Sequence, residues 1–222
     1  MLRVQDLHAF YGESHILHGV NFDVKRGELV TLLGRNGAGR STTLKAIMNM
    51  VGRRTGSIVI NGNETLRMKP HHIPRLGIGY CPEERGIFAS LDVHENLLLP
   101  PTVRSGGMSL DEIYGMFPNL YERRKSQGTR LSGGEQQMLA MARILRTGAR
   151  LLLLDEITEG LAPVIVQKLG EVLVQLKERG MTIVLVEQNF RFAAPLADRH
   201  FVMDHGQIVE EITAEQLPSR RE

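Results

Sequence analysis

Apolar runs and amphipathic stretches alternate along this chain, and their order predicts an α/β fold. Residues 28–33 form a short apolar run rich in β-formers, and the run stops at Gly34. Residues 41–50 then read as a helix that carries Leu44 and Ile47 on one side. The sequence therefore predicts a strand, a glycine loop and a helix in succession.

Two further pairs of strand and helix are predicted toward the C-terminal end. The strands cover residues 151–154 and 182–186, and the helices cover about residues 164–178 and 190–197. Strands that alternate with helices in this way are typical of a parallel sheet.

Three short runs near the N-terminus predict a small antiparallel sheet. They lie around residues 2–9, 15–24 and 57–60, and the last run meets a turn at Asn61-Gly62. We expect this sheet to flank the parallel one.

From about residue 91 to 146 the pattern becomes helical. Ser109 and Glu112 have the spacing of a capping box, in which each side chain satisfies a backbone amide of the other residue. We interpret this segment as a helical subdomain inserted into a single domain, whose core comprises about residues 1–90 and 147–222.

Composition narrows the class of protein. The 222 residues, 42% of them hydrophobic, suffice for one packed domain and not for two full ones. The 27 basic and 25 acidic residues nearly balance at a net charge of +2, which gives no electrostatic case for nucleic-acid binding. Cys81 is the single cysteine, so no internal disulfide can form, and the chain is compatible with a reducing cytosol.

The sequence carries no signal for entering a membrane. Residues 1–6 lack the apolar core of a signal peptide, and no apolar run approaches the roughly 18 residues that a bilayer span needs. We expect any membrane role to come through a partner, and the tail at residues 218–222 to be a solvated end.

The loop after the first strand carries glycines suited to holding phosphate. Gly34, Gly37 and Gly39 permit close approach and positive φ angles, so that backbone N–H groups can point at a phosphate chain. Taken alone, the motif would also fit an ordinary turn between a strand and a helix. The candidate phosphate-binding residues are Gly34, Arg35, Asn36, Gly37, Ala38, Gly39, Arg40, Ser41 and Thr42.

Arg40 departs from the general phosphate-loop pattern, which has lysine at this position. A guanidinium keeps the charge but is wide, planar and bidentate, whereas an ammonium is a compact point charge. We expect Arg40 to bind phosphate without placing its charge at the same point during transfer, which favours ATP binding over fast hydrolysis. Ser41 would supply its hydroxyl to Mg²⁺.

Two acids, Asp155 and Glu156, directly follow the strand at residues 151–154. Ligands bind at the carboxyl ends of strands in open α/β sheets, so both side chains are expected at such an edge. Asp155 would hold the Mg²⁺ shell through water, and Glu156 would polarise the attacking water. Acids also commonly begin loops between strands and helices, so this pair indicates a catalytic site only in combination with the other motifs.

The heptapeptide at residues 131–137, Leu-Ser-Gly-Gly-Glu-Gln-Gln, is the most specific motif. Ser132 and Glu135 have the spacing of a capping box, which would explain those two residues. Capping does not require Gly133 and Gly134, each of which weakens a helix start by up to roughly 1 kcal/mol relative to alanine. We therefore expect a ligand to approach this backbone.

The glycine loop, the heptapeptide and the acidic pair, in this order, resemble the ATP-binding-cassette (ABC) ATPases over nearly the whole chain. The resemblance implies a P-loop NTPase core with a mostly parallel sheet, an antiparallel β subdomain and a helical subdomain. It implies ATP hydrolysis, with ATP and Mg²⁺ as cofactors. It further implies that Ser132, Gly133 and Gly134 hold the γ-phosphate bound by the other subunit of a head-to-tail dimer, so that a monomer would be catalytically incomplete.

The same resemblance points to three weaker positions. Tyr11 resembles the aromatic residue that stacks on adenine, although a tyrosine near the N-terminus is often a packing residue. Glu83 stands where most cassettes have a glutamine that touches the metal, and a carboxylate can still bind Mg²⁺. Gln188 occupies the place of the usual switch histidine and can hydrogen-bond the γ-phosphate, but it cannot carry a proton.

Three segments narrow the resemblance to the smaller ATPase subunit of branched-chain amino acid importers: residues 82–83, 159–163 and 186–189. Arg40 and Ile157 depart even from that subfamily. The match implies two different membrane permeases, a sister cassette or a second copy of this chain, and a periplasmic substrate-binding protein. The subunit would be cytoplasmic and peripheral on the inner face of the membrane, and it would not select the solute.

The sequence is compatible with other functions as well. Similar subunits serve importers of urea, short amides and other polar solutes, and the length is compatible with a soluble cassette of an assembly complex. A degenerate ATP-binding regulator would explain Arg40 and Gln188 together, but the retained Glu156 argues against it.

The surface at residues 84–96 would discriminate a transporter subunit from a soluble cassette. Ile87, Phe88 and Leu91 would form an apolar groove for a helix of a permease, or they would simply pack the helical insertion.

Overall fold

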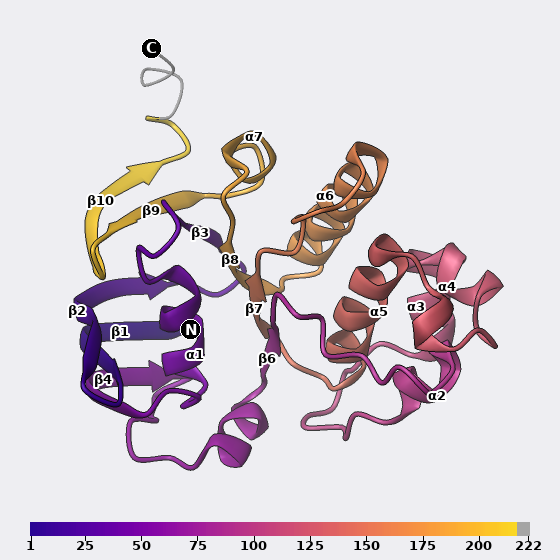
Figure 1. The fold of residues 1–222 in the computed structure, drawn as a ribbon, viewed down its shortest axis with the longest axis horizontal. Coiled ribbons are helices and arrows are strands. Elements are labelled where there is room, and N and C mark those ends of the chain that lie inside the picture. The colour runs from indigo at the N-terminus through magenta and orange to yellow at the C-terminus, as the bar shows by residue number, and fades with distance from the viewer. Residues whose placement is uncertain (217–222) are drawn as a thin grey trace.

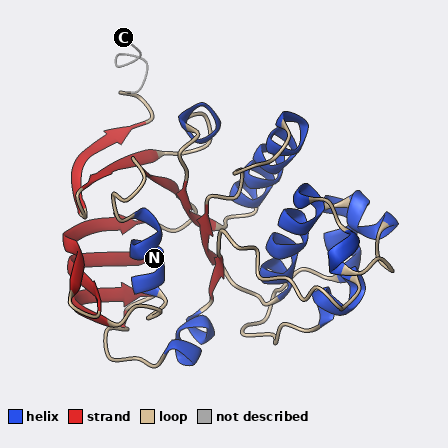
Figure 2. Cartoon of the chain, viewed as in Figure 1, coloured by secondary structure: helices blue, strands red, loops and turns tan. Residues whose placement is uncertain are grey.

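The computed structural model describes residues 1–216, and two β-sheets organise this part of the chain. Figure 2 shows the strands gathered on one side of the view and the larger helices on the other. The solvated tail expected at residues 218–222 lies outside the described residues. No helix among residues 1–216 is long and apolar enough to cross a membrane.

A six-stranded sheet forms the centre of the molecule, and all its neighbouring strands pair in parallel except β9 and β10. β3, β7 and β8 confirm the three predicted core strands, with ends within one residue of the prediction. In spatial order the strands are β10 (Gln207–Thr213), β9 (Arg199–Asp204), β3 (Leu29–Gly34), β8 (Thr182–Val186), β7 (Leu151–Asp155) and β6 (Ile78–Cys81).

The sequence pattern did not reveal β6, β9 and β10, for physical reasons. β6 has four residues and includes Gly79, so it is too short to show a pattern. β9 begins with the polar pair Arg199 and His200. β10 contains no fully buried residue, so its sequence lacks a stripe of side chains that face the core.

The expected antiparallel sheet has four strands in the order β2-β1-β4-β5. Its three long strands include the three predicted runs, although β4 begins at Arg53 rather than at residue 57. β5 adds a short hairpin after the turn at Asn61-Gly62. The strands are β1 (Leu2–Tyr11), β2 (Ser14–Val24), β4 (Arg53–Ile60) and β5 (Asn63–Glu64).

The helices follow the central strands or fill the segment between β6 and β7, except η1, which connects the antiparallel sheet to β6 (Figure 1). The first helix ends at Ile47 rather than residue 50, and Asn49 beyond it has a φ of 56°. The last helix ends at Ala193 rather than residue 197, because Pro195 has no amide hydrogen to continue it. The helices are α1 (Arg40–Ile47), η1 (Pro70–Leu76), α2 (Val93–Leu98), α3 (Leu110–Met116), α4 (Pro118–Glu122), η2 (Gly128–Arg130), α5 (Gly133–Arg146), α6 (Pro163–Glu178) and α7 (Phe190–Ala193).

The capping box predicted at α3 is present. The backbone N–H of Glu112 donates to the Ser109 hydroxyl at 3.2 Å, and the backbone N–H of Ser109 donates to the Glu112 carboxylate at 2.9 Å. This helix start therefore follows from local sequence.

Alternate side chains of the central strands fill two separate hydrophobic cores. On β7, Leu152 and Leu154 belong to a cluster that includes α5 and α6. Leu151 and Leu153 belong to a second cluster, which includes α1 and the antiparallel sheet. Burial on both faces explains why the sequence of β7 is an unbroken apolar run rather than an alternating one.

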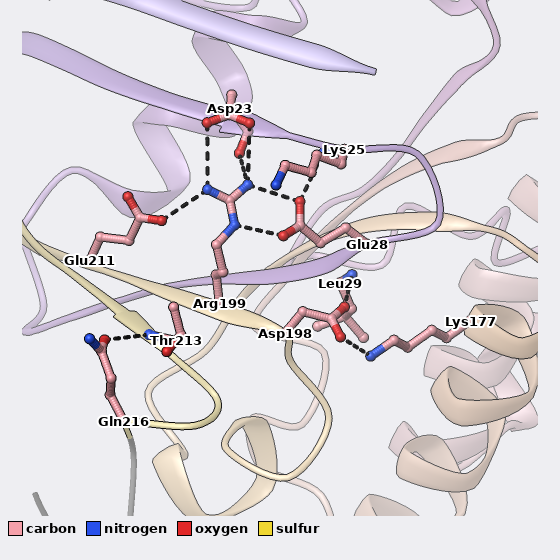
Figure 3. A network of polar contacts seen from close by, with 10 residues as sticks. All are labelled: Asp23, Lys25, Glu28, Leu29, Lys177, Asp198, Arg199, Glu211, Thr213 and Gln216. Atoms are coloured by element: carbon pink, nitrogen blue, oxygen red, sulfur yellow. Dashed lines mark hydrogen bonds and ion pairs between the residues drawn. The ribbon is translucent and has the colours of Figure 1, made fainter. Parts of the chain in front are cut away.

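Arg199 on β9 joins three elements of the fold (Figure 3). Its guanidinium donates to the Glu28 carboxylate at 2.6 and 2.9 Å and to Glu211 of β10 at 3.0 Å. It also donates to the backbone oxygen of Asp23 at the end of β2, at 2.9 Å. Only 12% of the Arg199 side chain is exposed, and its acidic partners raise the pKa of the guanidinium above its ordinary value. Arg199 thus ties the β9–β10 hairpin of the central sheet to the turn before β3 and to β2 of the antiparallel sheet.

Replacing Arg199 with alanine should lower the free energy of unfolding by about 2 kcal/mol, because Glu28 keeps its partly buried charge and loses its cation. Urea denaturation followed by circular dichroism measures the change. Lys168→Ala is the matched control, since Lys168 pairs with Glu171 on an exposed face of α6. This control should cost less than about 0.5 kcal/mol, and equal losses in the two variants would contradict the role given to Arg199.

Candidate active site

Three loops meet at one edge of the central sheet because β3, β8 and β7 run parallel. The register pairs Leu32 with Val186, and Val186 with Asp155. The glycine loop, the acidic pair and Gln188 follow these positions along the chain. Segments that are distant in sequence are thus brought to one place.

A pocket of about 390 Å³ lies at this edge, and most of its lining was predicted. Ile16 and Glu159 also line the pocket and were not predicted. The predicted residues in the lining are Asn36, Gly37, Gly39, Arg40, Ser41, Thr42, Glu83, Glu156 and Gln188. Gly34, Arg35 and Ala38 line a neighbouring hollow of about 610 Å³ between the loop and the β9–β10 hairpin.

The glycine loop has the tight backbone that its sequence predicts. Gly39, directly before α1, has a φ of 102°, and a Cβ atom there would lie 2.7 Å from Cδ2 of Leu17. A Cβ atom on Gly34 would strike the backbone oxygen of Met203. Glycine at both positions lets the loop bring the amino end of α1 to the pocket, where the helix dipole favours an anion.

The Arg40 side chain binds three groups of the pocket. Its Nη2 donates to Glu156 Oε1 at 2.8 Å and to Asn36 Oδ1 at 3.3 Å, and its Nη1 donates to the Glu187 backbone oxygen at 3.1 Å. Only 4% of this side chain is exposed. The cation expected on phosphate is therefore paired with the acid expected to polarise water.

Glu156 is held through both carboxylate oxygens. Oε1 accepts from Arg40, and Oε2 accepts from Nε2 of Gln188 at 2.8 Å. The Glu156 backbone has a φ of 47°, which residues other than glycine seldom adopt, and its N–H donates to the Val186 oxygen at 2.9 Å. A strained backbone and two side-chain partners thus fix the position of this acid.

Asp155 and Ser41 lie in direct contact. The Ser41 hydroxyl donates to Oδ1 of Asp155 at 2.8 Å, and the Tyr80 hydroxyl donates to Oδ2 at 3.2 Å. Burial raises the pKa of Asp155 above its ordinary value, and these two hydrogen bonds oppose the rise.

One hydroxyl and one carboxylate suit Mg²⁺, which usually takes few protein ligands and fills its shell with water and phosphate oxygens. No group of three His, Cys, Asp or Glu side chains among residues 1–216 is arranged to hold a metal ion by itself.

Glu187 fixes the turn that follows the acidic pair. Its carboxylate accepts from the backbone N–H of Thr158 at 3.1 Å and from the Thr158 hydroxyl at 2.9 Å. Burial raises the pKa of Glu187 to about 7, and the Thr158 bonds act in the opposite direction.

The heptapeptide begins α5 with the predicted capping box. The backbone N–H of Glu135 donates to the Ser132 hydroxyl at 3.3 Å, and the N–H of Ser132 donates to the Glu135 carboxylate at 2.7 Å. A Cβ atom on Gly134 would lie 2.9 Å from Ile165 of α6. Helix packing therefore favours glycine at this position, a reason that the sequence did not show.

Tyr11 and the segment Ser132 to Gly134 do not line the pocket. Tyr11 ends β1 with 41% of its surface exposed, and Ile16 on the facing strand β2 lines the pocket instead. In Figure 1, α5 lies on the far side of β6 and β7 from α1. Adenine stacking by Tyr11 and the action of the heptapeptide on a second subunit stay predictions.

The segment at residues 84–96, after β6, fits partly with each of the two interpretations: an exposed apolar groove and packing within the helical insertion. Ile87 packs against the core, Leu91 is half-buried, and Phe88 is 45% exposed with the Arg143 guanidinium 4.9 Å from its ring centre. Beside them, a hollow of about 220 Å³ lies between this loop and α5.

Tyr80, Glu159 and Glu187 contribute to the site without having been predicted. The signal for Tyr80 is its place three residues before Glu83 on the same short segment, but its bond to Asp155 depends on β6 pairing with β7. Glu159 lies close to Glu156, whose negative charge and hydrogen bond raise the pKa of Glu159.

Known proteins are similar to this chain in sequence and in fold. The family profile described as ABC transporter matches residues 17–159. The chain is 40% identical over 220 residues to the high-affinity branched-chain amino acid transport ATP-binding protein BraG of Pseudomonas aeruginosa, covering 98% of this chain and 94% of that protein. The chain belongs to the ABC transporter ATPases.

A second sequence relative and a solved structure are also similar to this ABC ATPase. A probable branched-chain amino acid transport ATP-binding protein, LivF of Archaeoglobus fulgidus, is 37% identical, with 98% of this chain and 94% of that protein covered. Among solved structures, the dimeric post-hydrolysis state of the cassette MJ0796 bound to ADP and Pi superposes with a TM-score of 0.85 at 26% identity, covering 96% and 99% of the two chains.

The ABC ATPase binds ATP and hydrolyses it, and its pocket suits that substrate. The amino end of α1 and the Arg40 guanidinium offer donors and positive charge to phosphate oxygens. Glu156 lines the same pocket.

The raised pKa of Glu187 predicts a pH-dependent stability. The carboxyl group titrates near its ordinary value of 4.5 in the unfolded chain and near 7 in the folded one. The folded chain thus holds the extra proton across this range, so the free energy of unfolding falls as the pH rises through it. Glu187→Gln removes this loss and should be more stable than the wild type at pH 8, with a smaller difference at pH 5.

Urea denaturation at the two pH values measures the Glu187 effect. Glu171→Gln, at an exposed site on α6, is the control and should show no pH-dependent gain. A difference between Glu187→Gln and the wild type that is the same at both pH values would rule out this titration.

Proposed function

We propose that this ABC ATPase is the energy-coupling subunit of an importer for branched-chain amino acids. The similarity to two proteins named for that transport, at 40% and 37% identity over nearly the full length, carries the proposal. The segments 82–83, 159–163 and 186–189, which resemble the smaller importer subunit, support it.

The residues of the pocket have the following proposed roles. Ser41 and Asp155 hold Mg²⁺, with Glu83 at the rim of the same pocket available to the ion. Glu156 polarises the attacking water, and Gln188 hydrogen-bonds the γ-phosphate. When bound, Mg²⁺ supplies the positive charge that stabilises the transferring phosphoryl group.

The dimer supplies the remaining contacts in this proposal. Ser132, Gly133 and Gly134 at the start of α5 act on the nucleotide of the opposing cassette, which is a sister chain or a second copy. Two solved dimeric structures of one cassette of the same fold, MJ0796, at 26% identity, support such a pairing. Within the described part of each chain, about residues 1–90 and 147–216 form the nucleotide-binding core, and about residues 91–146 form the helical subdomain.

The membrane partners follow from the same proposal. The subunit sits on the cytoplasmic face of the inner membrane and contacts two permeases, and a periplasmic binding protein delivers the solute. The exposed ring of Phe88 and the hollow beside α5 are suited to receiving a permease helix.

A second candidate is a cassette that serves another solute or another direction of transport. The chain is 31% identical to LptB, the lipopolysaccharide export ATP-binding protein of Haemophilus influenzae, with 98% of this chain and 92% of that protein covered. Importers of urea or short amides, and a soluble assembly ATPase, belong to the same set of alternatives.

Affinity capture of the tagged chain from gently solubilised membranes, followed by mass spectrometry, tests the proposal. Two polytopic permeases, a second cassette and a binding protein that takes up branched-chain amino acids are the expected result. A binding protein specific for urea or amides, or export permeases, would replace the proposal with the second candidate. Recovery from the soluble fraction alone would contradict any membrane role.

The proposed base predicts the phenotype of Glu156→Gln. This variant should retain ATP and accumulate as a closed dimer, while its ATP turnover falls by at least about 100-fold, because an amide cannot accept the proton of water. Phosphate release and size-exclusion chromatography with ATP measure the two effects. Glu122→Gln, on the exposed face of α4, is the control, and unchanged turnover in Glu156→Gln would refute the role of Glu156.

A further inference from the structure

The ion pair between Arg40 and Glu156 joins the phosphate loop to the proposed base. The 2.8 Å bond from Arg40 to Oε1 and the 2.8 Å bond from Gln188 to Oε2 occupy both oxygens of Glu156. Arg40 and Glu156 are exposed by only 4% and 9%. In this geometry one carboxylate oxygen is paired with a buried cation and the other with an amide, so each oxygen already accepts one hydrogen bond and the side chain is turned toward Arg40.

The same guanidinium is the cation that a phosphate would need. Of the described residues that line the pocket, Arg40 alone carries a positive side chain, whereas Glu83, Glu156 and Glu159 are acidic. A phosphate that enters this pocket therefore needs Arg40 to offset the acidic side chains. The guanidinium cannot keep its full contact with Glu156 and also turn both Nη atoms toward a phosphate.

We propose that the Arg40–Glu156 ion pair competes with nucleotide phosphate, so that Glu156 is released to hold water only when phosphate takes over Arg40. Arg40 is then a positioning residue for the base as well as a phosphate ligand. The proposal rests on the role of Glu156 given above, but it concerns a single chain and needs neither a permease nor a second cassette.

Arginine suits this double role better than lysine. Its planar fork spans Glu156, the side chain of Asn36 and the backbone oxygen of Glu187 at once. An ammonium is a compact point charge without a second nitrogen, so it cannot bridge these three acceptors in the same way. The departure from the usual lysine is therefore tied to the contact with Glu156.

Binding of ADP in the presence of EDTA tests the competition without turnover. ADP has no γ-phosphate for a second subunit to hold, and EDTA removes any contribution of a metal. The Kd is measured by isothermal titration calorimetry for the wild type, Glu156→Gln and Glu156→Ala. Both variants remove the charge that holds Arg40 and should bind ADP more tightly. The gain should be about tenfold in Glu156→Ala, the size expected from one buried charge-assisted hydrogen bond, and smaller in Glu156→Gln, because its amide oxygen still accepts from Arg40.

Two controls separate the ion pair from the general charge of the pocket. Glu159→Gln removes an equal charge from the same pocket, but this carboxylate interacts with Glu156 and makes no hydrogen bond to Arg40 in the described part of the chain, so the variant should change the Kd by clearly less than Glu156→Gln does. In an Arg40→Lys background, Glu156→Gln should gain less than about twofold, because the bridging guanidinium is absent.

The outcomes decide the proposal. Equal gains from Glu156→Gln and Glu159→Gln, or a full gain in the Arg40→Lys background, would overturn the specific competition. An unchanged Kd in both Glu156 variants, with thermal unfolding like that of the wild type, would overturn it as well. The importer proposal fails separately, through the partners found on the membrane.

Discussion

The parallel register of β3, β8 and β7 is the constraint on which the site depends. These strands are buried on both faces, so their order and register are set by the two hydrophobic cores rather than by the site itself. Because they run parallel, their carboxyl ends deliver the glycine loop, the acidic pair and Gln188 to one edge. The apolar sequence thus determines where the polar chemistry is placed.

Contacts around the pocket then fix the positions of the loop and of the acidic side chains. Gly34 and Gly39 let the loop pass close to β9 and β2. Tyr80 orients Asp155 from the neighbouring strand, and Glu187 holds the turn after the acids. These contacts come from segments far apart in the chain, so the pocket forms only when the central sheet and its flanking loops are complete.

The sequence predicted what is encoded locally. The glycine loop, the acids after an apolar strand and the capping boxes each require only neighbouring residues, and all three features appear as predicted. β10 was not predicted because it has no fully buried side chain. The need for glycine at position 134 also has a cause that the sequence did not show, because a Cβ atom there would crowd Ile165 of α6.

The pairing of Arg40 with Glu156 marks the limit of sequence reasoning. The substitution of lysine by arginine was visible, but the acceptor of the guanidinium depends on how β3 and β7 are placed by the fold. The sequence suggested an effect on phosphate, and the structure adds Glu156, the proposed base, as a partner of Arg40. Such contacts between motifs need the tertiary arrangement.

The most direct test of the central claim, that this edge of the sheet is an ATP and Mg²⁺ site, is calorimetric titration of the chain with ATP at increasing Mg²⁺. The account predicts one nucleotide per chain, bound more tightly with Mg²⁺, and loss of the Mg²⁺ enhancement in Ser41→Ala and Asp155→Asn because their oxygens lie together at 2.8 Å. An Mg²⁺ enhancement that survives in both variants would contradict it.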